Sequence, residues 1–563
     1  MEPIVECVPN FSEGIDKDVI NQISQTIESV AGVKLLNVDP GSATNRTVMT
    51  FVGHPDKVIE AAFLSIKKAG ELIDMRKHKG EHPRIGATDV CPLIPIANIT
   101  LEETAEYARQ LAKRVAEELS LPVYLYEAAQ TDPKRANLSV IRAGEYEGFF
   151  AKIKLPEWKP DFGPAEFDYK RGATIIGARD FLVAFNINLN TTSVRRANAI
   201  AFDVREAGRV KREGDQLTGR IVKDQNGIPV NIPGSLKSVK AIGWFIKEYD
   251  IAQISMNLTD INTTPVHIAF DEVCNKASSR GIRVTGSELI GLIPLQAMLE
   301  AGRYFLHKQK RSSGISDGEL IKIAIRSMGL NELSPFVPKE RIIEYMLETS
   351  AENTLIGMNL EEFATETASE SPAPGGGSVA AYVGALGISL ATMVANLSAH
   401  KKGWDDRWKE FSDYAETGQQ LKKQLLNLVD KDTQAFNKIM EALSLPNSSG
   451  NERKARNIAL QAATKTAIEV PLQVMEVAHS SMLIIKAMAT NGNPASVSDA
   501  GVGALCARSA TLGAYLNVLI NIGDCTDSDF VTVVKAKAES LKKKAVDLEV
   551  EILEIVYGKI ISA

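Results

Sequence analysis

The pattern of apolar residues changes once along the 563-residue chain, near residue 335. Before that point, short β-branched runs alternate with amphipathic segments, a pattern typical of an α/β or α+β sheet with helices packed on it. After it, the strand-like alternation stops and only long helical patterns follow, which predicts an all-α bundle. Ser334-Pro335 and Val337-Pro338 mark the linker between the two parts.

The first part divides again near residue 180. In its first half we expect strands at residues 4–8, 33–38, 47–52, 90–96 and 123–126, and helices at 19–30, 55–73 and 101–119. Thr100 and Glu103 predict a capping box for the last of these helices. In its second half, strands at 181–189 and 251–258 are each followed by a helix, at 193–207 and 265–278, which predicts a split β-α-β arrangement.

These patterns predict the domain organisation. We expect one subdomain at residues 1–179, a second at 180–330, a linker at 331–339 and an all-α domain at 340–563. Helices of the last domain are predicted at 340–347, 360–368, 378–397, 407–428, 432–443, 451–478, 500–522 and 529–557. The run 379–397 is long enough to cross a membrane, but its Gly, Ala and Ser content favours a buried helix, so no membrane span is expected.

The bulk composition excludes several classes of protein. A net charge of -6 gives no support to a nucleic-acid partner, which usually needs a basic face. The first residues lack the basic and apolar regions of a secretory signal. Five scattered cysteines without a Cys-x-x-Cys pair predict reduced thiols and no metal site. We therefore expect a cytoplasmic protein.

Residues 78–92 are the most informative short stretch. They hold His78 and His82, two of the seven histidines, among Lys77, Lys79 and Arg84. An imidazole among cations can move a proton near neutral pH while the cations hold an anionic substrate. Pro83 restricts His82 to extended backbone, a suitable pose for a general base. The alternative is a solvated basic loop whose histidines have no chemical role.

A second candidate is Asp39, which follows an apolar run and precedes Pro40 and Gly41. An acid at the end of a strand is a common site position. Asp-Pro-Gly is also good turn chemistry, so a purely structural turn is the alternative.

Two features of the helical part can carry chemistry. Gly375, Gly376, Gly377 and Ser378 open an apolar helix, and backbone N–H groups there can hold an anion, although a tight entry into a crowded helix is the alternative. Asp432 lies on the apolar stripe of its helix, whereas Asp430 falls off it. A buried carboxyl has a raised pKa and can carry protons; the alternative is a helix cap or an ion pair.

Several of these segments together resemble the formiminotransferase–cyclodeaminase family. The segments are residues 6–14, 80–89, 177–189 and 373–381. The resemblance implies two transferase subdomains, each a ferredoxin-like sheet with helices on its outer face, followed by a helical-bundle deaminase. It also implies that folate lies between the transferase subdomains, that tetrahydrofolate is a co-substrate with no metal required, and that the protein is a homo-oligomer.

The implied activity has two steps. The formimino group of N-formimino-L-glutamate passes to N5 of tetrahydrofolate, and the product then cyclises to 5,10-methenyltetrahydrofolate with release of ammonia. His82 would be the base of the first step, with Asp39 orienting it or protonating the leaving amine. Arg84 suits substrate carboxylates, Asp432 would shuttle the proton that expels ammonia, and residues 375–378 would hold folate.

The resemblance also implies a folate-binding stretch. It comprises Gly163, Pro164, Ala165, Glu166, Phe167, Asp168, Tyr169, Lys170, Arg171 and Gly172. Two alternatives to the bifunctional enzyme are a transferase fused to a methenyltetrahydrofolate cyclohydrolase-like bundle, and a folate-binding module without catalysis.

Overall fold

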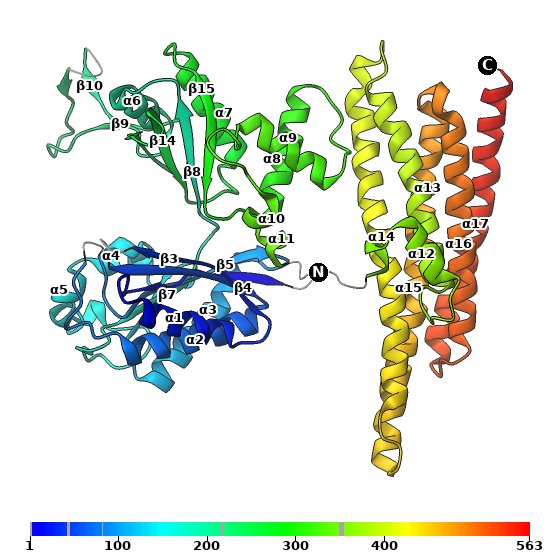
Figure 1. Cartoon of the computed structure of the whole chain (residues 1–563), viewed down its shortest axis with the longest axis horizontal. Coiled ribbons are helices and arrows are strands. Elements are labelled where there is room, and N and C mark those ends of the chain that lie inside the picture. The colour runs from blue at the N-terminus through cyan, green and yellow to red at the C-terminus, as the bar shows by residue number, and fades with distance from the viewer. Residues whose placement is uncertain (1–2, 42–44, 81–82, 215–218, 348–353, 563) are drawn as a thin grey trace. The chain divides into compact units, whose positions relative to one another are not determined.

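The computed structural model describes residues 3–41, 45–80, 83–214, 219–347 and 354–562 (Figure 1). The chain forms two compact units, one of residues 1–297 with 328–347 and one of residues 298–327 with 348–563. This division differs from the expected one at two places. Residues 298–327 group with the helical unit, and residues 340–347 group with the α/β unit. The second difference has a simple cause, because Ile293 exchanges backbone hydrogen bonds with Arg341 and Ile343.

The first subdomain is built on a seven-stranded sheet. Its elements are β1 (Ile4–Cys7), β2 (Asn10–Phe11), α1 (Lys17–Glu28), β3 (Val33–Gly41), β4 (Arg46–Gly53), α2 (Pro55–Leu72), β5 (Thr88–Ala97), α3 (Leu101–Leu119), β6 (Val123–Glu127) and β7 (Thr174–Ala178). Strands β3, β4, β1 and β5 are antiparallel neighbours in that order, and β7 and then β6 extend the sheet as parallel strands. The order is ferredoxin-like with two strands added.

The second subdomain repeats the same order without the extension. Its elements are β8 (Val183–Leu189), α6 (Val194–Val204), β13 (Val239–Ile246), β14 (Ile251–Leu258), α7 (Val266–Ser278) and β15 (Val284–Ile290). The antiparallel sheet runs β13-β14-β8-β15. The expected ferredoxin-like arrangement is therefore confirmed for both subdomains.

An arm of short strands interrupts the second subdomain between α6 and β13. Strand β9 (Arg209–Val210) pairs with β12 (Asn231–Ile232), and β10 (Arg212–Glu213) pairs with β11 (Arg220–Ile221). Figure 1 shows this arm beside α6. The sequence analysis did not anticipate it, because two-residue strands carry no periodic signal.

Helices cover one face of the first sheet, as the pattern of apolar residues in the sequence predicted. Val5 and Cys7 alternate inward from β1 and are fully buried with residues of α1, α2 and α3. The capping box of α3 is present, because Thr100 accepts from the backbone of Glu103 and the Glu103 carboxylate accepts from Thr100. Such a cap stabilises a helix by about 1 kcal/mol.

Two helices that the sequence analysis missed form a separate small core in this subdomain. Helices α4 (Leu138–Arg142) and α5 (Glu145–Lys152) contribute Ile141 and Phe149 to a cluster with Tyr124. The Tyr124 and Phe149 rings meet edge to face at 5.4 Å. Both helices are too short for a clear helical period, which explains why they were not predicted.

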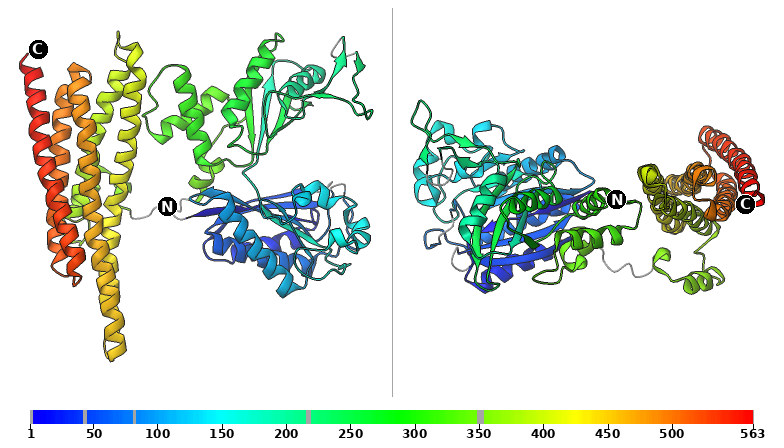
Figure 2. Two further views of the ribbon diagram at one scale, coloured as in Figure 1. Left: turned by 180° about the vertical axis from the view of Figure 1, so that it is seen from behind. Right: turned by 90° about the horizontal axis from the view of Figure 1, so that it is seen from above.

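The second unit is the predicted helical bundle (Figure 2). Its helices include α12 (Leu360–Thr367), α13 (Gly376–Ala399), α14 (Trp408–Ser444), α15 (Gly450–Asn491), α16 (Val497–Ile522) and α17 (Ser528–Ile561). The break predicted between residues 428 and 432 is wrong, since α14 continues through it. The expected apolar stripe of α14 also ends early: Leu428 and Val429 are buried, but Phe436 and Leu443 are exposed.

A loop that precedes the bundle helices in the sequence also belongs to this unit. Ser312, Ser313 and Gly314, between α8 (Leu295–Lys308) and α9 (Asp317–Met328), dock on α13 and α14. The Ser313 backbone donates to Ser412 Oγ at 3.1 Å, and Asn396 donates to the Gly314 carbonyl at 2.8 Å. The polar groups of this segment are thus satisfied inside the unit.

Small residues allow the bundle helices to approach closely. Gly387 of α13 and Gly503 of α16 face each other, and a Cβ on either would lie 2.9 Å from the other's carbonyl oxygen. Helices α13, α15 and the stretch Pro494–Ile522 are long and apolar enough to cross a membrane, with 44% to 61% of their most apolar windows buried in the structure. The absence of a membrane span stays a prediction.

The glycine contact generates a test of bundle packing. We expect Gly503→Ala to lower the free energy of unfolding by about 1–3 kcal/mol, because the added methyl forces the α13 and α16 backbones apart. Gly558→Ala is the matched control, because a Cβ at this exposed position of α17 meets nothing within 4 Å. That control should stabilise by up to about 1 kcal/mol through helix propensity. Equal shifts in melting temperature for the two variants would contradict the packing argument.

Candidate active sites in the two units

Three sequence segments that are distant in the chain meet where strands β5 and β7 of the first sheet begin. The backbones of residues 85–87 and 171–173 pair, with Ala87 N donating to Arg171 O at 2.8 Å and Ala173 N donating to Ile85 O at 3.0 Å. Ser12 joins them, because its hydroxyl donates to the Gly86 carbonyl at 2.7 Å. The histidine loop and the expected folate-binding stretch are therefore neighbours.

Glycine is required at this junction. A Cβ on Gly86 would collide with the backbone of Arg171 and Ala173, and a Cβ on Gly172 would collide with the backbone of Ile85. Gly172 also has a φ of 75°, a conformation that side chains disfavour. The close approach holds the end of the expected folate-binding stretch against the histidine loop.

The loop contains two histidines, of which one can be described. His82 lies outside the described residues. The ring of His78 is engaged on both sides: Nδ1 accepts from Arg84 Nε at 3.2 Å, and Nε2 lies 2.8 Å from the Asn45 carbonyl oxygen. A neutral ring with its proton on Nε2 satisfies both contacts. His78 thus holds the loop through both ring nitrogens, and the role expected for His82 stays a prediction.

Arg84 is used differently from what the sequence analysis expected. Its side chain is 7% exposed, and its guanidinium donates to Glu147 at 2.6 and 2.9 Å and to Glu145 at 3.1 Å. These protein carboxylates occupy the positions that substrate carboxylates would take. In this structure Arg84 ties α5 to the histidine loop, a contact that no sequence spacing indicated.

Asp39 belongs to a group of alternating charges. It lies exposed on β3 opposite Val48, and β3 continues through Pro40 to Gly41, so these residues form a strand and not the turn that was the alternative interpretation. The carboxylates of Asp39 and Asp89 both act on Arg46, whose pKa burial lowers. Asp89 is 1% exposed and pairs with Arg142. Burial raises the pKa of Asp89 despite this partner.

A hollow of about 420 Å³ opens beside this charged group. Pro83, which directly follows His82, lines it together with Arg142 and Glu145 of the first subdomain and Lys240 of the second. Both subdomains therefore contribute to one hollow next to the histidine loop. Its cations suit an anionic substrate.

The stretch from Gly163 to Gly172 forms a compact turn. Asp168 accepts from the backbones of Lys170 and Arg171 and from Arg171 Nε. Phe167 packs in the small aromatic core, whereas the Tyr169 ring is 60% exposed. Lys170 and Arg171 line a second hollow of about 380 Å³ with residues of α2 and α3. The stretch thus offers an aromatic face and two cations, and its contacts with folate stay a prediction.

In the helical unit the predicted residues come together at the start of α13. Ser378 Oγ lies 3.0 Å from Asp432 Oδ2, and the Ser378 backbone also hydrogen bonds to this carboxyl. A Cβ on Gly377 would collide with Asp432, and Gly376 faces Asn517 of α16. Burial raises the pKa of Asp432, and the two bonds from Ser378 oppose that rise. The carboxyl therefore sits at a glycine-lined helix start.

The hydroxyl of Ser378 has two acceptors within hydrogen-bond distance but only one proton. Ser378 Oγ lies 3.0 Å from two acceptors, the Asp432 carboxyl and the Val429 carbonyl oxygen. A hydroxyl has one proton and cannot donate to both at once. When Asp432 is protonated, it can donate to Ser378 while Ser378 donates to Val429, and every contact is satisfied. The geometry thus suits a carboxyl that gains and loses a proton.

Asp430 has a structural contact instead. Its Oδ1 accepts from the Leu355 backbone at 2.8 Å and holds that segment on α14. The alternative of a helix cap for this pair of acids is wrong, since both lie inside α14. Asn517 was not predicted, because an isolated asparagine on an apolar helix has no distinctive spacing.

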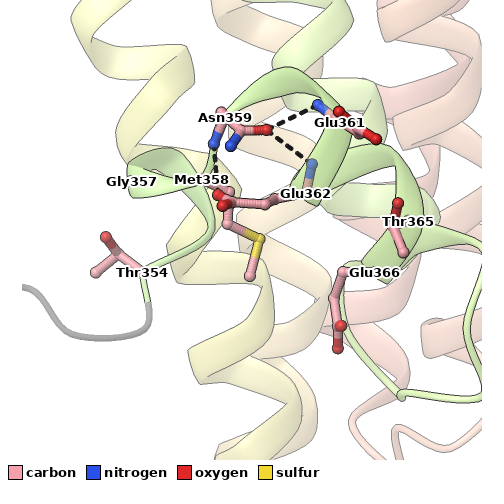
Figure 3. Close-up of a pocket in the computed structure, with 8 residues that line it drawn as sticks. All are labelled: Thr354, Gly357, Met358, Asn359, Glu361, Glu362, Thr365 and Glu366. Atoms are coloured by element: carbon pink, nitrogen blue, oxygen red, sulfur yellow. Dashed lines mark hydrogen bonds between the residues drawn. The ribbon is translucent and has the colours of Figure 1, made fainter.

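Another hollow in the helical unit, of about 690 Å³, does not match the expected substrates (Figure 3). Glu361, Glu362 and Glu366 line it, and Asn359 caps α12 within it by accepting from the backbones of Glu361 and Glu362. Three carboxylates without a lining cation would repel an anionic folate. We assign it no role.

The sequence analysis did not single out Glu6, a buried acid in β1. Glu6 is 4% exposed, and burial raises its pKa to about 7, while the charge of Arg179 opposes that rise. Strand alternation places it on the face opposite Val5 and Cys7, away from the helix-covered core.

Comparison with known proteins agrees with this two-part construction. Three family models match the chain: the formiminotransferase domain, N-terminal subdomain, at residues 4–179; the formiminotransferase domain at 184–348; and formiminotransferase-cyclodeaminase at 359–540. Fold and matches together define a chain that joins a two-subdomain transferase region to a helical cyclodeaminase region.

Relatives cover the whole chain and each part of it. The formimidoyltransferase-cyclodeaminase of Gallus gallus is 43% identical over 97% of both chains. The glutamate formimidoyltransferase of Thermoplasma acidophilum is 42% identical over 57% of this chain and 96% of its own. The methenyltetrahydrofolate cyclohydrolase of Methylorubrum extorquens is 34% identical over 36% of this chain and 97% of its own. The chain belongs to the formiminotransferase–cyclodeaminase family, which confirms the resemblance.

The raised pKa of Glu6 generates a prediction about stability. The unfolded chain titrates near 4.5 and the folded chain near 7, so folding favours the protonated acid. The free energy of unfolding should therefore fall as pH rises from about 4.5 to 7, by about 3 kcal/mol at ~1.36 kcal/mol per pKa unit. Glu6→Gln should remove this loss. Melting temperatures at pH 5 and pH 8 test it, and parallel pH profiles for the two proteins would contradict it.

Proposed function

We propose that this chain is a bifunctional folate enzyme of histidine degradation. It transfers the formimino group from N-formimino-L-glutamate to N5 of tetrahydrofolate, and then cyclises the product to 5,10-methenyltetrahydrofolate with release of ammonia. One observation carries the proposal: similarity over 97% of both chains to a formimidoyltransferase-cyclodeaminase. The two candidate sites, one in each unit, support it.

The transferase step takes place in the α/β unit. N5 of tetrahydrofolate attacks the formimino carbon, a tetrahedral intermediate forms, and the bond from that carbon to the glutamate nitrogen breaks. His82 takes the N5 proton as general base. The engagement of His78 by Arg84 and Asn45 supports this choice between the two histidines.

Other residues of this unit position the reactants. The hollow lined by Arg142 and Lys240 holds the carboxylates of the substrates. Arg84 acts by holding the histidine loop, because its guanidinium is already engaged by Glu145 and Glu147. Asp39 supplies a carboxyl group that orients His82 when it is ionised, or protonates the leaving amine when it carries a proton. The stretch Gly163–Gly172 binds folate, with Tyr169, Lys170 and Arg171 as its most accessible chemistry.

The cyclodeaminase step takes place at the start of α13. N10 attacks the carbon attached to N5, the bond to the imino nitrogen breaks, and ammonia leaves. Asp432 delivers the proton that makes this nitrogen a leaving group, and Ser378 hydrogen bonds to whichever form the carboxyl holds. Residues 375–377 bring the folate close, because they have no side chains. No metal takes part in this proposal, and that expectation stays a prediction.

A cyclohydrolase activity of the bundle is the second candidate. The observation that favours it is the 34% identity to a methenyltetrahydrofolate cyclohydrolase over 36% of this chain. Full-length similarity to bifunctional enzymes favours the deaminase. Ammonia release from 5-formiminotetrahydrofolate distinguishes the two, because a cyclohydrolase would hydrolyse the methenyl product without producing ammonia. Turnover by the purified protein also distinguishes both from a folate-binding module without catalysis.

We also propose that the protein works in the cytoplasm as a homo-oligomer, on small molecules and without nucleic acid or a membrane span. Exposed apolar side chains on α13 and α16, such as Leu397, Leu516 and Ile520, support association. Light scattering of the purified protein tests the oligomeric state.

The central experiment follows both products in one reaction. Purified protein is incubated with N-formimino-L-glutamate and tetrahydrofolate, and methenyl absorbance and ammonia are measured together. We expect both to rise in equal amounts. If neither product forms at any substrate concentration, the proposal is overturned.

His82→Ala should lose transferase turnover by about 10²–10⁴-fold, because a general base contributes that range. Ammonia release from supplied 5-formiminotetrahydrofolate should be unchanged in the same variant, because that step uses the other unit. His54→Ala is the control, since it removes a half-buried imidazole at the start of α2. Full transferase activity in His82→Ala would refute the assigned role.

Asp432→Asn should abolish ammonia release while formimino transfer continues, so that 5-formiminotetrahydrofolate accumulates. The amide has the shape of the carboxyl but cannot shuttle a proton. Asp430→Asn is the matched control, because its carbonyl oxygen can still accept from Leu355. Equal loss of both activities in Asp432→Asn would indicate misfolding, which a melting curve would reveal. Loss of ammonia release in Asp430→Asn alone would show that Asp430, and not Asp432, has this role.

A further inference from the structure

A hollow in the second subdomain lies on the outward side of α6, and none of its lining residues belongs to the candidate active sites. It has a volume of about 360 Å³ and is enclosed by α6 and the segment that leads into the arm. Helix α6 turns its buried residues Ala197, Ile200, Ala201 and Val204 toward the sheet. Its opposite side carries Arg195 and Phe202, which line the hollow.

The lining is unusually rich in arginine. Arg195 comes from α6, and Arg205, Arg209 and Arg212 come from the segment that follows it. Among the described residues that line the hollow, none is acidic. Four guanidiniums in one small space repel one another unless anions balance them.

One carboxylate close to the hollow is shared between two guanidiniums. Asp203 pairs with Arg209, but it also pairs with Arg280, so one carboxylate serves two cations. Burial and the charge of Arg280 lower the pKa of Arg209. Arg212 donates to the Gly219 carbonyl, which carries no net charge.

Arg195 is the most available of the four. Among the described residues it has no hydrogen-bond or ion-pair partner. Arg205, by contrast, is held in place: its Nε donates to the Gly208 carbonyl at 2.8 Å, and its guanidinium stacks 4.1 Å from the Phe202 ring centre. The hollow thus combines a fixed guanidinium, a free one and an aromatic ring.

We propose that this hollow is a binding site for a small organic anion with two or more phosphate or carboxylate groups. Arginine donates pairs of parallel hydrogen bonds to both kinds of group. Phe202, Ala199 and Val210 give the hollow an apolar side that suits the uncharged body of such a molecule. The volume excludes a macromolecule as the main occupant.

Titration calorimetry on the full chain tests the site with three probes: pyrophosphate, ADP and citrate. Pyrophosphate and ADP represent phosphate ligands, ADP adds a flat body, and citrate represents carboxylates. We expect saturable binding of at least one probe. Arg195→Gln should weaken that binding about tenfold or more, because a hydrogen bond between charged groups is lost.

Two further variants complete the test. Arg212→Gln should weaken binding as Arg195→Gln does, whereas Arg220→Gln removes an equal charge from the exposed β11 of the same arm and should leave binding unchanged. Transferase and cyclodeaminase turnover without probe should be unaffected in all three. The proposal is overturned if no probe binds at millimolar concentration, if Arg195→Gln binds as tightly as the unaltered protein, or if Arg220→Gln weakens binding equally.

Discussion

The contact between Asp432 and the first turn of α13 depends on the absence of a side chain at Gly377. Any Cβ there would occupy the space of the carboxyl. The same device recurs along the helix, because Gly387 meets Gly503 of α16 backbone to backbone. Close packing of small residues thus both assembles the bundle and shields the half-buried Asp432 from part of the solvent, and this desolvation raises its pKa.

The α/β unit uses glycine for a related purpose. Gly86 and Gly172 let two loops pair through their backbones, and this pairing brings the histidine loop and the stretch ending at Gly172 together where β5 and β7 begin. The ion pairs around Arg84 then fix α5 against the same loop. Rigid backbone contacts position loops more accurately than long side chains can, which is what a two-substrate reaction requires.

The sequence predicted the parts of this fold that have long periodic patterns. The strands at residues 251–258 and the helix at 101–119 are found where they were expected, and the repeated strand–helix passes correctly indicated ferredoxin-like subdomains. Two-residue strands such as β9, and short helices such as α4 and α5, have too few alternations or turns to show a period. Unit membership also could not be predicted, because residues 298–327 are assigned by contacts that are distant in sequence.

The candidate sites show the same limit at the level of single residues. Asp432 and Asp430 differ in their contacts, since Asp432 faces Ser378 and Asp430 holds Leu355, and the choice of Asp432 as the catalytic acid stays a prediction. Charge type alone did not indicate the ion pairs of Arg84, because a guanidinium suited to substrate carboxylates is equally suited to Glu145 and Glu147, which only the fold brings near. A cation is available to a ligand only where the fold supplies too few carboxylates, and this condition holds at Arg195 but not at Arg84.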